Sequence, residues 1–155
     1  MYKRQTGFTL IELIVVIVIL GILAATALPK FLGIQSGARI SILQGARGAV
    51  ASSMNIAYAT QQSQGLGSNV GITLDGVSIA MVGGYPISFG NASGIYTAAG
   101  LSSPDYSVVG GSNALGVGST IMVATATTPT QCAFSYTAAT ATAPPVVGAV
   151  ITSGC

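Results

Sequence analysis

The chain has 155 residues, of which 50% are hydrophobic and 5% charged, and its formal net charge is +2. It contains no His, and its acidic residues are Glu12, Asp75 and Asp105, which excludes most metal centres and most acid/base catalysis. The length predicts one modest domain, and the composition predicts a protein that is not an enzyme and binds no cofactor or metal.

The longest apolar run follows a short basic segment. From Phe8 to Leu28 the run has about 21 residues, enough for a helix that crosses a hydrocarbon core. Lys3 and Arg4 precede it and favour a cytoplasmic N-terminus, with everything after the run outside the cytoplasm. The alternative is an ordinary secretory signal cut near Ala27, but its apolar region would be too long and would contain no acid.

Glu12 lies inside this apolar run, where a lone carboxylate is costly. One explanation is its depth, since it lies about one helical turn from Phe8 and is within reach of the headgroup region. The other explanation is that the chain is cut before Phe8, so that the new ammonium group of one copy pairs with Glu12 of a neighbouring copy.

The residues around Glu12 resemble a known processing signal. Lys3-Arg4-Gln5-Thr6-Gly7 followed by Phe8-Thr9-Leu10-Ile11-Glu12 resembles the prepilin signal of type IVa pilins, in which prepilin peptidase removes a short basic leader and the new N-terminal Phe is methylated. The resemblance is close through Pro29-Lys30-Phe31 and extends more loosely to the rest of the helix and the cysteine pair. Within this family, Phe31-Leu32 and Gly84-Tyr85-Pro86 resemble the mannose-sensitive haemagglutinin (MSHA) type pilins.

The resemblance implies that residues 1–7 are a cleaved leader and that Gly7 precedes the scissile bond. It implies that Phe8 is the methylated new terminus and that Phe8 and Glu12 act in assembly. The implied partners are other copies of the chain in a filament, the prepilin peptidase and methyltransferase, the inner-membrane assembly machinery, and the membrane itself before assembly. The expected location is the bacterial inner membrane, as a single-pass protein, and then an extracellular pilus.

One long helix is predicted from Phe8 to about Gln61. Residues 8–29 form its transmembrane and assembly half, and residues 30–61 form an amphipathic half. Gly21 and Pro29 mark a weak section, because glycine adds backbone freedom and proline lacks an amide donor; in the pilins this section can melt on assembly. The apolar residues of the second half recur at helical spacing: Leu32, Ile40, Leu43, Ala46, Val50, Met54 and Ala57.

Residues 62–155 are rich in Gly, Ser, Thr, Val and Ala, which predicts a β-rich head. Strands are expected at Val70–Leu74 and Val77–Val82, joined by a tight turn in which Asp75 is a turn residue rather than a ligand. Further strands are expected at 106–109, 120–126, 131–138 and 146–152, with a short helix at 93–99 and an exposed loop at 137–145. The expected fold is α+β, the type IV pilin fold, with the long helix on an antiparallel sheet.

Cys132 and Cys155 are the only cysteines and both lie late in a chain that begins with an export segment. This usage predicts one disulfide in an oxidising compartment, and the alternative is a pair of inert thiols. Closing a loop of about 24 residues would contribute roughly 3 to 4 kcal/mol.

Three functions remain open. The leading hypothesis is a structural subunit that polymerises into a type IV pilus for attachment, with twitching or DNA uptake as properties of the whole fibre. The second is a type II secretion pseudopilin or a minor pilin. The major pseudopilin binds calcium through acidic loops, and Asp75 and Asp105 are too few carboxylates to equip this chain well for calcium. The third is a membrane-tethered binding domain that never polymerises. Direct nucleic-acid binding is not expected, because no Lys or Arg follows Arg47.

Overall fold

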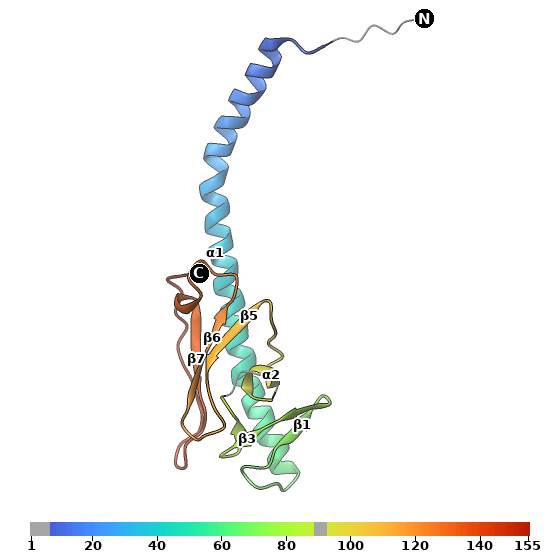
Figure 1. Ribbon diagram of the computed structural model, residues 1–155, viewed down its shortest axis with the longest axis vertical. Helices are drawn as coiled ribbons and strands as arrows, with labels where there is room; N and C mark the ends of the chain where they lie inside the picture. Colours follow the sequence, from blue (N-terminus) through green and yellow to red (C-terminus); the bar gives the residue numbers. More distant parts are fainter. Residues whose placement is uncertain (1–6, 89–92) are drawn as a thin grey trace, which may run out of the picture. The chain divides into compact units, whose positions relative to one another are not determined.

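The computed structural model describes residues 7–88 and 93–155, so Lys3 and Arg4 lie outside the described residues. All paired strands are antiparallel, and the architecture is α+β and pilin-like, as predicted (Figure 1). The elements in chain order are α1 (Leu10–Ser63), β1 (Ile72–Leu74), β2 (Val77–Ile79), β3 (Met81–Val82), β4 (Tyr85–Pro86), α2 (Ile95–Ala98), β5 (Tyr106–Gly110), β6 (Gly118–Val123), the 3-10 helix η1 (Pro129–Gln131), β7 (Ala133–Thr137) and β8 (Val146–Val147).

The chain divides into two compact units, Met1–Gly37 and Ala38–Cys155, and α1 contributes to both. In the second unit, called the head below, one face of α1 is buried at intervals of three and four residues, the spacing that the sequence predicts. The buried residues on this face are Leu43, Ala46, Val50, Ser53, Ala57 and Gln61. Ile40 and Met54 are half-buried against the same core, and the side chain of Leu32 is outside the described ones.

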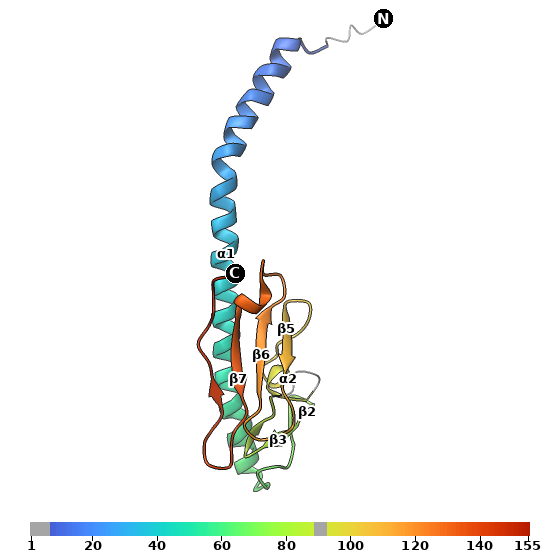
Figure 2. The ribbon, with the colours of Figure 1, turned by 60° about the vertical axis from the view of Figure 1, so that its left-hand side comes forward.

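A four-stranded sheet in the order β5-β6-β7-β8 packs against this face of α1. Figure 2 shows β5, β6 and β7 side by side next to the helix. Alternate residues of β6 and β7 enter the core, because successive side chains of a strand point to opposite faces. The core residues from these strands are Ile121, Val123, Phe134 and Tyr136, all buried with Leu43 and Val50 of the helix.

The predicted hairpin around Asp75 is confirmed, but it is shorter than expected. Asp75 and Gly76 both have positive φ, 49° and 80°, as a tight hairpin turn requires. β2 ends at Ile79, and the next amide, that of Ala80, donates to the carbonyl of Ser93 at 2.6 Å. A separate hairpin, β3–β4, follows around Gly83-Gly84, whose φ values of 59° and 86° favour glycine; the sequence analysis missed it.

The strand expected at 146–152 is reduced to β8 and a single bridge at Ile151. Tyr136 pairs with Val147, and Ala133 pairs with Ile151. Between these two pairs the chain advances four residues, from Val147 to Ile151, but only three residues in β7, from Ala133 to Tyr136. The extra residue is a bulge that interrupts the pairing. The expected exposed loop at 137–145 is also partly wrong, because Ala138 and Ala139 are buried.

The remaining elements differ from their predicted bounds at the ends. β6 begins earlier and stops at Val123, since the chain turns there. The strand expected at 131–138 begins only at Ala133, because Gln131 belongs to η1, a tight helical turn that starts at Pro129, which cannot donate to a ladder. In the described part of the head, the single sheet that was expected is three sheets, namely β1-β2, β3-β4 and the four-stranded sheet.

Candidate functional site

The helix begins at Leu10, two residues later than predicted, because Thr9 caps it. The hydroxyl of Thr9 accepts a hydrogen bond from the amide of Glu12 at 3.3 Å, and the carboxylate of Glu12 accepts one from the amide of Thr9 at 2.8 Å. The hydroxyl of Thr9 also donates to this carboxylate at 2.7 Å. The arrangement is a capping box, which satisfies amides that lack partners at a helix start. The Thr-x-x-Glu spacing in the sequence carried this signal, and the sequence analysis missed it.

Gly7 and Phe8 precede the helix and are exposed, and the bond between them lies outside regular secondary structure. An ideal Cβ built at Gly7 meets no atom within 4 Å. Phe8 and Glu12 line the same apolar hollow on the helix surface, together with Ile11, Leu13, Val15 and Val16. The structure therefore brings the predicted processing junction and the predicted assembly carboxylate close together.

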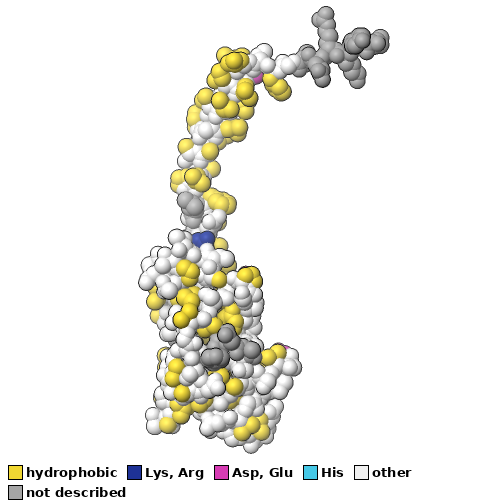
Figure 3. Space-filling view, in the orientation of Figure 1, with side chains coloured by type: hydrophobic (Ala, Val, Ile, Leu, Met, Phe, Trp, Pro, Cys, Tyr) yellow, Lys and Arg dark blue, Asp and Glu magenta, His cyan; other side chains and the backbone are white. Residues whose placement is uncertain are grey.

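The helix from Leu10 to Phe31 exposes nearly all of its large apolar side chains. Figure 3 shows hydrophobic side chains covering this part of the surface. Soluble monomers rarely expose so large an apolar patch, which marks a surface for a membrane or for another protein. By length and composition, α1 is able to cross a membrane.

Gly21 and Pro29 lie within the helix, and the helix is continuous through both. Pro29 has no amide hydrogen to donate to the carbonyl of Ala25, so one backbone hydrogen bond of the helix is missing. One turn earlier, the hydroxyl of Thr26 donates to the carbonyl of Leu23 at 3.0 Å, a contact that weakens and bends helices slightly. These features support the prediction that residues 21–29 are the weak section, which stays a prediction.

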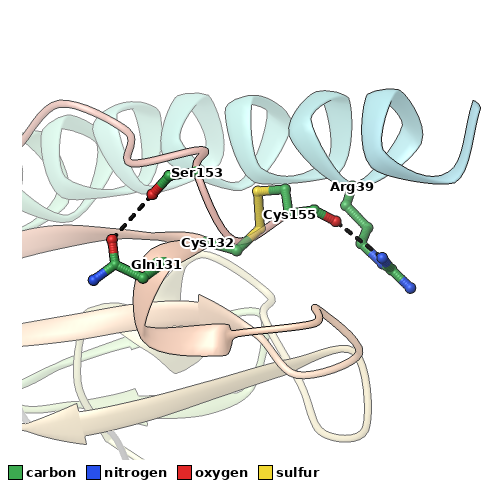
Figure 4. Close-up of a disulfide and its surroundings, with 5 residues drawn as sticks. All are labelled: Arg39, Gln131, Cys132, Ser153 and Cys155. Atoms are coloured by element: carbon green, nitrogen blue, oxygen red, sulfur yellow. Dashed lines mark hydrogen bonds between the residues drawn. A yellow bond between two sulfur atoms is a disulfide. The ribbon is translucent and has the colours of Figure 1, made fainter. Parts of the chain in front are cut away.

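The predicted disulfide between Cys132 and Cys155 is present. It joins Cys132, the residue before β7, to the last residue of the chain segment 148–155, called the strap below (Figure 4). Both cysteines are buried. The strap is held further by hydrogen bonds from the amide of Thr128 to the carbonyl of Gly154 at 3.1 Å and from the hydroxyl of Ser153 to the side chain of Gln131 at 3.0 Å.

Two arginines of α1 fasten the strap to the helix, and the sequence analysis assigned neither of them. Arg39 donates from Nη1 to the carbonyl of Cys155 at 2.9 Å, as Figure 4 shows. Arg47 donates from Nε to the carbonyl of Gly148 at 2.8 Å, at the bulge where this carbonyl is released from the ladder. The sequence contained a signal for these contacts, because neither arginine has an acidic residue three or four positions away on the helix. Each side chain therefore needs a partner from another part of the chain.

Gly154 is required where the strap crosses the end of η1. A Cβ at this position would lie 2.5 Å from the carbonyl oxygen of Thr128 and 2.6 Å from Cβ of Gln131. We expect Gly154→Ala to lower the free energy of unfolding by about 1 to 3 kcal/mol, the usual cost of overpacking. Denaturant unfolding of the full chain in detergent measures this change. Gly67→Ala is the control and should be nearly neutral, since its Cβ would meet only Val70, at 3.7 Å; an equal loss in both variants would contradict the packing argument.

The tyrosines of the head serve packing. The hydroxyl of Tyr136, which is fully buried, donates to the carbonyl of Pro86 at 2.7 Å, and burial raises the pKa of Tyr136, with a smaller contribution from Tyr85. Tyr58 and Tyr85 stack with ring centroids 4.8 Å apart. Within the described residues, no group of three or more His, Cys, Asp and Glu side chains is placed to hold a metal.

Residues 2–28 carry the prokaryotic N-terminal methylation motif. The motif contains the capped helix start, the Gly7–Phe8 junction and Glu12.

Two relatives share more of the chain. The type II secretion system core protein G of Pseudomonas aeruginosa is 41% identical over 70 residues, which is 41% of this chain and 49% of that protein. The type IV narrow pilus major component PilA5 of Thermus thermophilus is 44% identical over 63 residues, 41% of this chain and 53% of that protein. The chain thus spans about half the length of these relatives. No solved structure is significantly similar to it. Over part of its length the chain is therefore similar to pilin and pseudopilin subunits.

Proposed function

We propose that the chain is cut between Gly7 and Phe8 and polymerises into a type IV pilus that attaches the cell to surfaces. The observation that carries the proposal is Glu12, an acid on a helix whose apolar side chains are exposed from Leu10 to Phe31. A surface of this kind is stabilised by a membrane or by contact with other protein, including copies of itself, and a buried carboxylate among such copies needs a positive partner. The ammonium group that cleavage creates at Phe8 is such a partner.

The location and partners follow from this proposal. The subunit spans the inner membrane once with its N-terminus in the cytoplasm, and meets the prepilin peptidase and methyltransferase and then the assembly machinery. It leaves the membrane when it joins other copies in the extracellular fibre. Within the pilins we propose an MSHA-type subunit, on the resemblance of Phe31-Leu32 and Gly84-Tyr85-Pro86 in the sequence.

A type II secretion pseudopilin is the second candidate, because the relatives include core protein G of Pseudomonas aeruginosa and of Vibrio cholerae. The head favours the pilus. Its two carboxylates, Asp75 in the β1–β2 turn and Asp105 before β5, belong to different sheets, whereas a calcium loop gathers several oxygen ligands.

The processing step gives a direct prediction. Mass spectrometry of the chain recovered from the sheared surface fraction should show a protein that begins at Phe8 and carries one added methyl group. The reason is that the junction is exposed and unhelical, and that the methylation motif spans it. A terminus just after Ala27 would establish the secretory-signal alternative and overturn the proposal.

A further inference from the structure

The head, Ala38–Cys155, contains only four charged side chains, which are Arg39, Arg47, Asp75 and Asp105. Arg39 is half-buried and binds the end of the strap, and Asp75 forms the β1–β2 turn. Arg47 and Asp105 are both exposed. Within the part of the chain that the structure describes, the carboxylate of Asp105 accepts no hydrogen bond and faces no ion-pair partner.

Each of these two residues lies in a hollow beside the same stretch of α1. Asp105 lines a hollow of about 290 Å³ with Ile42, Tyr106, Val123 and Thr125. Arg47 lines a hollow of about 350 Å³ with Gln44, Ala149 and Val150. Because Ile42, Gln44 and Arg47 lie within two turns of the helix, the two hollows are at a similar height along it.

The two hollows lie at opposite edges of the four-stranded sheet. Asp105 directly precedes β5, the first strand in the sheet order, and the hydroxyl of Tyr106 reaches the carbonyl of Ile42 at 3.4 Å. Ala149 follows β8, the last strand, next to the contact between Arg47 and Gly148. The acidic hollow and the basic hollow therefore face away from each other across the head and cannot close on each other within one copy.

The guanidinium of Arg47 retains donors for a second partner. Its Nε–H is used by the carbonyl of Gly148, and this bond holds the group at the edge of the strap. The two Nη groups carry the fork of N–H donors that fits a carboxylate. An exposed pair of this kind adds little affinity, but it fixes which surfaces meet and in which register.

We propose that the Arg47 hollow of one copy docks on the Asp105 hollow of the next copy in the fibre. Two surfaces of opposite charge on opposite edges of one subunit form a head-to-tail contact, which builds a filament when its rotation does not close into a ring. The contact lies between heads and is separate from the apolar helices and Glu12. It rests on the proposed polymerisation and names the surface that the next copy occupies.

Cross-linking in filaments tests this contact. Thr125 and Ala149 are exposed, and each lines one hollow without being the charged residue. In the full chain carrying both Thr125→Cys and Ala149→Cys, a short bismaleimide should join successive copies into a ladder of covalent multimers, whereas each single variant stays monomeric. The native cysteines do not react, because they are joined in the disulfide. Adding Asp105→Asn should lower ladder formation about threefold to fivefold, the scale of an exposed ion pair.

The controls separate this contact from the polymerisation itself. Val77→Cys with Ala149→Cys uses another exposed site, in β2, and should yield no ladder. Gln44→Cys with Thr125→Cys leaves the strap untouched and should yield the same ladder as the first pair. Normal filaments in which neither test pair gives a ladder would overturn the proposed docking, and so would dimers formed by a single variant. Either result would leave the pilus proposal standing. Cells with the unmodified chain that make no filaments would instead overturn the pilus proposal.

Discussion

Glu12→Ala is expected to leave the protein in the inner membrane, cleaved and with a folded head, and to abolish its surface filaments. Among packed apolar helices an unpaired carboxylate is costly, so a subunit docks in the register where the Phe8 ammonium of a neighbour reaches it. Alanine removes the charge whose pairing sets this register. It also makes the segment more apolar, so membrane insertion should be at least as efficient. Immunoblots of membrane and shear fractions measure both outcomes.

The capping box makes a sharper control necessary, because Glu12 has two roles in the structure. In one role its carboxylate accepts a hydrogen bond from the amide of Thr9, and in the other its negative charge is available to pair with a positive group. Glu12→Gln keeps a side chain that caps the helix but removes the charge. We expect Glu12→Gln to abolish filaments as Glu12→Ala does, and Thr9→Ala, which keeps the charge, to retain them. Normal fibre from Glu12→Gln would assign the role of Glu12 to capping, and normal fibre from Glu12→Ala would make it an interfacial residue.

Cys155→Ser is expected to lower the free energy of unfolding of the head by about 3 to 4 kcal/mol. Without the disulfide, the unfolded chain regains the conformational entropy that closing a loop of about 24 residues removes. The strap would then depend on its hydrogen bonds with Arg39, Arg47, Thr128 and Gln131 and on the bridge at Ile151. Denaturant unfolding of the full chain in detergent measures the loss.

Reduction of the unmodified protein serves as the matched control for this variant. It removes the same cross-link without changing a side chain other than the two thiols, so the two losses should agree. A variant as stable as the oxidised protein would show that the strap is held by its other contacts.

The sequence was sufficient for features that depend on local chemistry. The Asp75-Gly76 turn, the helical spacing of Leu43, Ala46 and Val50, and the pairing of two lone cysteines each follow from residue type and spacing. The helix start was misplaced only because the Thr9 cap was overlooked.

Features that depend on distant partners could not be predicted in the same way. The bulge that shortens β8 depends on how the strap passes β7, and the roles of Arg39 and Arg47 depend on carbonyl groups more than a hundred residues away in the chain. The break between β2 and β3 falls at Ala80, which forms hydrogen bonds with Ser93 and Ile87 outside the first hairpin. Such contacts appear only when the chain is folded.

The central claim is that this chain is the subunit of a surface fibre, and electron microscopy of cells with and without it tests the claim most directly. Cells that carry the chain should show filaments labelled along their length by an antibody against the head, and cells that lack it should lose these filaments. Restoring the chain should restore them. Identical filaments in both strains, or labelling confined to the cell envelope, would contradict the claim.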